Sequence, residues 1–447
     1  MPINVLVADD SAYLRKKISD ILKGHELIKI LEFAKNGEEA VDFVAKYSPD
    51  VLVLDLVMPK MNGLDAFKLI MDEHPTPTVI LSAISPKNLD SSIQALLMGA
   101  FDYIIKPGGI GAKDLPRFKE ELLGKVLLAS QSQIKKIFRK GDEPIKKGMT
   151  IRQEIIDEIF NFGQYLNRLQ PVQETEQDSG TQIIDIGKTK VVTTKETQQL
   201  IKKEQGDITK SEKLSMTDQK VTRVTSSSIL KKSVSTKYEK KKFTFVPNLT
   251  PVRGVLLTSN IVVIGASVGG PRTITTILKE LPRDLNAPIL IVQHLSSHFT
   301  EAFVDNLRIE CNMRVKVATN KENLHAGVCY IAPGDVHMEI GVENKKPIIK
   351  LYKGTPVNFC MPSIDVLFFS AAKIFRNKTL GIILTGMGAD GVEGLGAIKK
   401  LGGKTVSESE ETCILYAMPK FAAEKGYADF KLPNYKIAEK IIGYTNN

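Results

Sequence analysis

Short apolar runs alternate with amphipathic segments in two separate stretches of the chain, and this pattern constrains the fold more than any other feature. In the first stretch, runs at 3–8, 28–33, 51–56, 79–82 and 102–105 predict strands, while 11–22, 62–71 and 89–98 predict helices. In the second, 261–264, 289–292, 329–332 and 380–384 predict strands, while 273–281, 364–374 and 394–401 predict helices. Such alternation favours parallel, doubly wound sheets. We therefore expect two α/β domains, at residues 1–125 and 259–447.

The stretch between the two domains, 126–258, has a different composition. From about 131 onward Lys, Thr, Ser and Gln dominate, and only 151–169 keeps the apolar spacing of an amphipathic helix. Such a stretch buries too little apolar surface to offset the entropy lost on ordering, so we predict a long flexible linker. It also carries roughly +9 of the formal net charge of +10. The two domains are thus nearly neutral, which disfavours a nucleic-acid-binding output domain.

Composition and cysteine spacing indicate the cellular compartment in which the protein is expected. No apolar run has membrane-spanning length, and the first residues do not resemble a secretory signal. The four cysteines are scattered, without the spacing of a zinc site or a disulfide framework. We therefore expect a cytoplasmic protein with reduced cysteines that is not inserted in a membrane.

Polar side chains follow four of the strands predicted in the first domain. Asp9 and Asp10 follow the first strand, Asp55 lies at the end of the third, and Ser82 and Lys106 end later strands. The carboxyl ends of parallel strands meet at one edge of a sheet, so these side chains should converge. Clustered carboxylates suit Mg²⁺, beside which a carboxylate can accept a phosphoryl group. Helix capping accounts for Asp9 or Asp10 alone, but not for all five residues.

A glycine-rich turn follows the first strand predicted in the second domain. Gly265, Ser267 and Gly269 have the Gly-x-Ser-x-Gly spacing of a nucleophile elbow, in which a sharp turn exposes the serine hydroxyl. The backbone N–H groups of the following helix can stabilise an oxyanion. Glycine-rich strand–helix turns also bind phosphates, so a nucleotide site remains an alternative on this motif alone.

A serine nucleophile needs a base, and four histidines lie in the second domain. His294 ends a predicted strand at the same sheet edge as the serine, and we weigh it evenly against His298, His325 and His337 together. Asp390 follows another strand and could orient the imidazole, or it could cap the next helix. The order Ser, His, Asp differs from that of α/β-hydrolases.

Segments 7–11 (VADDS), 55–63 (DLVMPKMNG) and 103–107 (YIIKP) resemble the flavodoxin-like receiver domain of bacterial two-component response regulators. The resemblance implies that Asp55 accepts phosphate from a histidine kinase. It assigns supporting roles to Asp9 and Asp10 as ligands of Mg²⁺, to Ser82 and Tyr103 as a switch pair, and to Lys106 as the phosphoryl clamp.

The second domain resembles the Rossmann-like catalytic domain of the chemotaxis protein-glutamate methylesterase family, CheB. The matching segments are 264–270 (IGASVGG), 293–295 (QHL), 331–338 (IAPGDVHM), 362–368 (PSIDVLF), 384–391 (LTGMGADG) and 411–420 (ETCILYAMPK). The resemblance implies that Ser267 is the nucleophile, His294 the base, Asp390 the orienting acid and Met387 N–H an oxyanion donor.

The same resemblance implies hydrolysis of glutamate methyl esters on methylated chemoreceptors, with methanol released and no cofactor for the esterase. Deamidation of receptor glutamines is the companion reaction. We further hypothesise that the unphosphorylated receiver domain covers Ser267 until a chemotaxis histidine kinase phosphorylates Asp55. Two positions depart from the family pattern: Val268 replaces a threonine, and Cys360 with Met361 replaces His-Arg. A non-catalytic binding module is the alternative for this domain.

Overall fold

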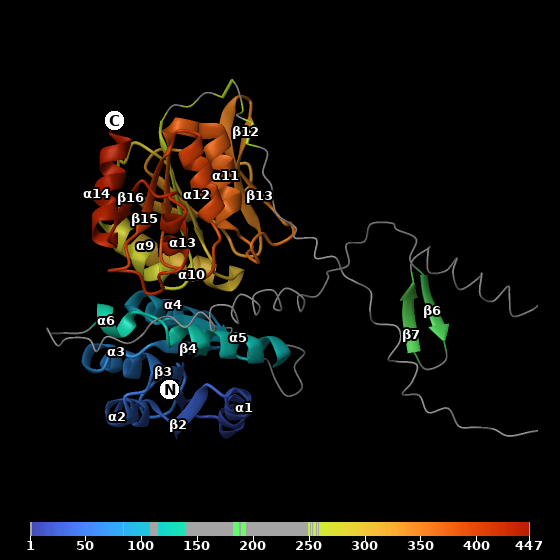
Figure 1. Ribbon diagram of the computed structural model, residues 1–447, viewed down its shortest axis with the longest axis vertical. Helices are drawn as coiled ribbons and strands as arrows, with labels where there is room; N and C mark the ends of the chain where they lie inside the picture. The colour runs from blue at the N-terminus through green and yellow to red at the C-terminus, as the bar shows by residue number, and fades with distance from the viewer. Residues whose placement is uncertain are drawn as a thin grey trace, which may run out of the picture. The chain divides into compact units, whose positions relative to one another are not determined.

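The computed structural model describes residues 2–83, 85–107, 115–138, 182–186, 189–193, 249–250, 252, 254–255, 257 and 259–446 (Figure 1). The helix predicted at 151–169 and most of the predicted linker lie outside these residues. The described residues up to 138 and from 249 onward belong to one compact unit, and those at 182–193 belong to another.

The N-terminal sheet has five parallel strands, as the sequence predicts. They are β1 (Ile3–Ala8), β2 (Ile28–Ala34), β3 (Val51–Asp55), β4 (Thr78–Ser82) and β5 (Asp102–Ile105). Their order is β2-β1-β3-β4-β5, with Val5 beside Val51 and Leu54 beside Ile80 in the register. Every residue of β3 and β4 is buried, because helices cover both faces of a doubly wound sheet.

Polar side chains cap the N-termini of four of the helices that surround this sheet. The helices are α1 (Ala12–Lys23), α2 (Gly37–Tyr47), α3 (Gly63–Glu73), α4 (Pro86–Met98), α5 (Leu115–Ala129) and α6 (Ile134–Ile137). Ser11, Asn36, Asn62 and Ser85 accept hydrogen bonds from the first turns of α1 to α4. Because Ser11 is the N-cap of α1, capping does not account for Asp9 or Asp10. Helix α5 continues to Ala129, past the domain boundary predicted at residue 125.

The C-terminal sheet has seven parallel strands, in the order β10-β11-β9-β8-β14-β15-β16. They are β8 (Ile261–Ala266), β9 (Ile289–Gln293), β10 (Arg314–Val317), β11 (Val328–Ile331), β14 (Thr379–Ile383), β15 (Lys404–Glu408) and β16 (Phe430–Leu432). An antiparallel hairpin, β12 (His337–Glu343) with β13 (Lys346–Tyr352), stands apart from this sheet. The sequence predictions missed β10, β15 and β16, because each is short and includes charged residues.

Helices cover both faces of the C-terminal sheet (Figure 1). They are α9 (Gly270–Lys279), α10 (Ser297–Glu310), α11 (Ile364–Phe375), the 3₁₀ turn η1 (Arg376–Lys378), α12 (Val392–Lys400), α13 (Met418–Glu424) and α14 (Asn434–Thr445). Successive residues of β8 face opposite sides: Val262 packs in the core that includes Phe303, and Val263 in the core that includes Phe368. Within the described residues, every helix is too short or too polar to cross a membrane.

The second unit is represented by a single hairpin. Strands β6 (Gln182–Ile186) and β7 (Thr189–Thr193) pair antiparallel, with Gln182 opposite Thr193. This hairpin falls inside the stretch for which the sequence predicts a linker without regular structure.

Two candidate sites lie where the order of the strands reverses along each sheet. In the N-terminal sheet the reversal lies between β1 and β3. Asp9 and Asp10 follow β1, and Asp55 is the last residue of β3. In the C-terminal sheet the reversal lies between β8 and β14, whose ends lead to Ser267 and Asp390. Loops part at such switch points and leave a crevice, so ligands of open α/β sheets bind there.

Candidate active site and phosphorylation site

Ser267 lies in a tight turn between β8 and α9. Gly269 has a φ of 76°, a conformation that favours glycine, and a Cβ at Gly270 would lie 1.9 Å from the side-chain oxygen of Gln293. Thr385, in the loop after β14, accepts a hydrogen bond from Ser267 N at 3.0 Å. The glycines therefore allow the close approach, and two neighbouring segments hold the serine in place.

Asp390 is anchored at the N-terminus of α11. Its carboxylate accepts hydrogen bonds from Ser363 Oγ at 2.8 Å, Ile364 N at 2.6 Å and Asp365 N at 3.3 Å, and Asn358 Nδ2 donates a further one at 2.9 Å. Only 2% of Asp390 is exposed. Backbone N–H groups and the helix dipole stabilise a negative charge in this position. Asp390 thus serves α11 as an anion bound at its first turn, and it does not cap the helix that follows it, α12.

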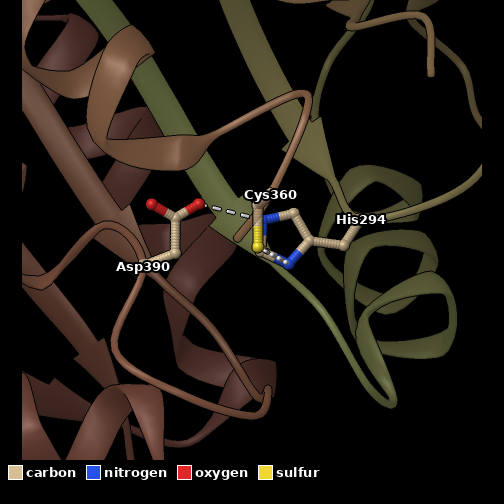
Figure 2. Close-up of side chains that lie close together, drawn as sticks. All are labelled: His294, Cys360 and Asp390. Atoms are coloured by element: carbon tan, nitrogen blue, oxygen red, sulfur yellow. Dashed lines mark hydrogen bonds and ion pairs between the residues drawn. The ribbon is translucent and has the colours of Figure 1, made fainter. Parts of the chain in front are cut away.

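His294 connects Asp390 with a residue that the sequence analysis did not select. Its Nε2 lies 3.0 Å from Asp390 Oδ2, and its Nδ1 lies 3.7 Å from the sulfur of Cys360 (Figure 2). The carboxylate accepts the Nε2 proton, so Nδ1 is the nitrogen available as a base. Among the described contacts of Ser267 there is no hydrogen bond to His294, although both residues line one small cavity. Catalytic hydrogen bonds are often long before substrate binds.

Burial and neighbouring groups shift three pKa values here. Burial favours neutral Asp390, but hydrogen bonds from His294, Asn358 and Ile364 outweigh it and lower the carboxyl pKa. For His294, burial opposes the charged form, while Cys360 and Asp390 raise the imidazole pKa. Burial also raises the pKa of the Cys360 thiol, which is therefore neutral near pH 7. We accordingly attribute the upward shift of His294 to Asp390.

The cavity beside Ser267 is too small for a substrate side chain. Its volume is about 20 Å³, and its lining includes Leu96, Phe101 and Asp102 of the N-terminal domain together with Ser267 and His294. That volume accommodates about one water molecule. In this conformation the N-terminal domain therefore lines part of the small space beside the serine.

The other histidines of the C-terminal domain and Met387 lie outside the hydrogen bond between His294 and Asp390. His298 and His325 are exposed, whereas buried His337 accepts a hydrogen bond from Ser363 N at 3.2 Å and so supports the start of α11. Met387, 39% exposed, lies in the turn that follows β14. The sequence analysis noted Cys360 only as a departure from the family pattern and did not select it as a site residue, because a single cysteine in a loop has no periodic or motif signal. Its position just before the matched segment 362–368 was the available indication.

The predicted acidic pocket forms in the N-terminal domain. Asp9 and Asp55 are 0% and 3% exposed, and Lys106 Nζ lies 2.9 Å and 2.6 Å from their carboxylates. Burial raises the pKa of Asp55, although Lys106 opposes the shift. Asp10 is exposed at the rim, and one carboxylate oxygen from each aspartate lies within 4.8 Å of the others. A cluster of three carboxylates fits a hard divalent cation.

The two residues of the predicted switch pair have different surroundings. Ser82, 2% exposed, accepts a hydrogen bond from Ser92 Oγ at 2.8 Å inside the N-terminal domain. Tyr103 instead contacts the C-terminal domain: its ring centroid lies 3.9 Å from that of Phe299. Its hydroxyl lies 3.4 Å from Ser296 Oγ and 3.3 Å from Ser296 N. Tyr103 therefore connects β5 with the start of α10.

Comparisons with known proteins match both domains to known families. Residues 5–113 match the response regulator receiver domain family, and residues 262–441 match the CheB methylesterase family. A protein-glutamate methylesterase/protein-glutamine glutaminase from Thermotoga maritima is 32% identical over 98% of each chain. One of the same name from Pyrococcus horikoshii is 30% identical over 98% of this chain and 93% of its own. The crystal structure of the Thermotoga maritima CheB methylesterase catalytic domain shares 42% identity over 42% of this chain and 99% of its own, with a TM-score of 0.41.

The fold and the two sites define a response regulator whose output domain has the architecture of a hydrolase. The receiver match further indicates phosphorylation with a divalent metal. The chain belongs to the CheB family of chemotaxis protein-glutamate methylesterases.

Proposed function

We propose that this chain hydrolyses glutamate methyl esters on chemoreceptors, with Ser267 as nucleophile, His294 as base and Asp390 as orienting acid. The observation that carries the proposal is the buried Asp390–His294 hydrogen bond of 3.0 Å beside the serine turn, at the switch point of the sheet. The matched names of full-length relatives support the substrate class.

In the proposed reaction, Ser267 Oγ attacks the ester carbonyl carbon while His294 Nδ1 accepts its proton. Asp390 holds the imidazole by Nε2 and stabilises the positive charge that forms. The backbone N–H of Met387 donates to the oxyanion. Methanol leaves with the proton returned by His294, and water then cleaves the acyl-enzyme to glutamate and free serine. A glutamine side chain follows the same steps with ammonia as the leaving group.

Methanol release from methylated receptor membranes tests this proposal, with Ser267→Ala as the nucleophile variant. Ser297→Ala, in the first turn of α10, is a matched control because Ser297 is an exposed serine away from the elbow. We expect the first variant to lose methanol release and the second to retain it. Retained release in Ser267→Ala would contradict the esterase assignment and favour a non-catalytic binding module.

We further propose that phosphorylation of Asp55 relieves inhibition by the receiver domain. The 20 Å³ cavity lined partly by Leu96 and Phe101 supports an unphosphorylated state that excludes substrate from Ser267. A phosphoryl group on Asp55 would draw Ser82 and Lys106 toward it, and Tyr103 would move with β5 and leave Ser296. The kinase of the chemotaxis pathway is the proposed phosphodonor.

Asp9, Asp10 and Asp55 are the residues that would hold Mg²⁺ for this phosphorylation. Bound there, the cation neutralises the incoming phosphoryl oxygens. Lys106, already paired with Asp9 and Asp55, would exchange part of that pairing for a phosphoryl oxygen.

The regulatory proposal is tested by comparing the chain with its Asp55→Asn variant, each with and without a small-molecule phosphodonor and Mg²⁺. We expect methanol release to rise only in the chain that retains Asp55. Equal responses of the two proteins would show that Asp55 is not the switch.

A further inference from the structure

The Cys360 thiol occupies the side of His294 from which a proton would be accepted. Cys360 Sγ lies 3.7 Å from Nδ1, and Nε2 is already engaged by Asp390 at 3.0 Å (Figure 2). The thiol also lies 3.4 Å from the carbonyl oxygen of Asn358, which anchors it in the loop before α11. The hydrolytic steps described above use no sulfur atom, so this contact needs a separate explanation.

The spacing of the two donor atoms matches the edge of a zinc tetrahedron. Zn–N bonds of about 2.0 Å and Zn–S bonds of about 2.3 Å, joined at the tetrahedral angle, separate nitrogen and sulfur by about 3.5 Å. The observed separation of Nδ1 and Sγ is 3.7 Å. A metal ion could therefore bind both atoms with a small side-chain adjustment.

The surroundings of His294 also match those of a metal-binding histidine. Such a histidine usually donates its second ring N–H to a carboxylate, which fixes the ring and makes the ligating nitrogen more basic. Asp390 accepts from Nε2 and is itself held by Ser363 and Ile364. Both Cys360 and His294 are partly exposed, so water can complete the coordination of the ion.

We propose that Cys360 and His294 form a binding site for a thiophilic divalent cation of the Zn²⁺ class, and that the bound ion reversibly blocks hydrolysis. The thiol releases its proton to solvent when the metal–sulfur bond forms. The ion takes the Nδ1 lone pair, so His294 can no longer accept the Ser267 proton. This inhibitory consequence rests on the proposed function, whereas binding does not.

The donor types separate this site from the acidic pocket of the receiver domain. Sulfur and imidazole favour zinc and other late transition metals, while Mg²⁺ prefers oxygen ligands. Asp9, Asp10 and Asp55 offer oxygen alone, so a metal ion bound there would have no thiolate absorption.

The binding experiment titrates Co²⁺ into the metal-stripped full-length chain and follows thiolate-to-cobalt charge-transfer absorption. We expect a band that Zn²⁺ displaces. Cys360→Ser should lack the band, and Cys311→Ser should retain it, because Cys311 is a partly exposed cysteine away from the active site. Asp390→Asn should weaken Co²⁺ binding by about 10- to 100-fold. An unchanged band in Cys360→Ser would overturn the proposed site.

The activity experiment measures methanol release in the presence of a phosphodonor and Mg²⁺, with and without Zn²⁺, each protein being compared with its own rate without Zn²⁺. We expect Zn²⁺ to inhibit the native chain and Cys311→Ser, a chelator to restore activity, and Cys360→Ser to resist inhibition. A cobalt band together with unchanged methanol release would overturn the inhibitory role. Absence of methanol release from the Zn²⁺-free chain supplied with phosphodonor and Mg²⁺ would instead contradict the proposed function.

Discussion

Replacing Asp390 with asparagine tests the orientation of the proposed base. In the carboxylate, Oδ1 accepts from Ser363, Asn358 and Asp365, so the amide oxygen of the variant should take that position. The amide nitrogen then replaces Oδ2, which faces Ile364 N at 2.6 Å and His294 Nε2 at 3.0 Å. The amide nitrogen of the variant and the N–H of Ile364 would then be two donors facing each other. His294 would have to accept a hydrogen bond from the amide nitrogen at Nε2.

Both consequences can be given a size. A buried N–H left without an acceptor costs about 1–3 kcal/mol, so the free energy of unfolding should fall by that amount. An imidazole that accepts at Nε2 carries its proton on Nδ1 and cannot act as a base there. The same tautomer change in serine hydrolases lowers kcat by about 10⁴. We therefore expect a large loss of kcat with a moderate loss of stability.

The assay is steady-state methanol release by the full-length chain, together with chemical denaturation of each variant. Ser363→Ala is the matched control: it removes one hydrogen bond from Asp390 but keeps the carboxylate and the Nε2–H tautomer of His294. It should lose about 1.5–3 kcal/mol of stability, as expected for a hydrogen bond to a charged group, and much less kcat. Equal losses of kcat in the two variants, or a loss below about 10-fold in Asp390→Asn, would refute the proposed tautomer.

Three further variants test other parts of the structure. Tyr103→Phe removes two long hydrogen bonds between the domains, worth about 1 kcal/mol together. Methanol release without phosphodonor should therefore rise up to about five-fold. No rise would show that this contact does not restrain the closed state. Gly386→Ala places a Cβ 2.7 Å from that of Ser267, and displacement of the nucleophile should lower kcat by about 100-fold; a near-normal rate would mean that the elbow tolerates the shift. Burial opposes the charge of Asp429, but hydrogen bonds, with Lys399 foremost, lower the pKa of its carboxyl group. The ionised form therefore stabilises the fold above about pH 4, and this contribution is lost as pH falls through the lowered pKa. Asp429→Asn should therefore reduce the free energy of unfolding by about 1 kcal/mol at neutral pH and much less at acid pH, and an equal loss at both would contradict the assignment.

The local pattern of apolar residues was sufficient to predict the fold class, which is α/β with parallel sheets. The continuous apolar runs at β1, β3, β8 and β9 predicted buried parallel strands, and the structure confirms them. Short strands with charged residues, such as β15, escaped prediction because their side chains have no apolar periodicity. Glu408 illustrates the reason: it is fully buried in β15 and accepts hydrogen bonds from Thr385 and Thr412. Only its tertiary partners make that burial tolerable.

The sequence by itself determined which residues end strands, and in parallel sheets those ends converge. Strand ends alone left His294 weighed evenly against three other histidines, and the family resemblance then named Ser267, His294 and Asp390 as a group before any contact was known. The tertiary structure decided how they pair, because strand order and the packing of α11 bring together residues far apart in the chain. Asp390 bound at the first turn of α11, and Cys360 against Nδ1 of His294, are contacts of this kind. Periodicity and motif spacing report local conformation, whereas a side chain's partners depend on how the sheet is assembled and covered.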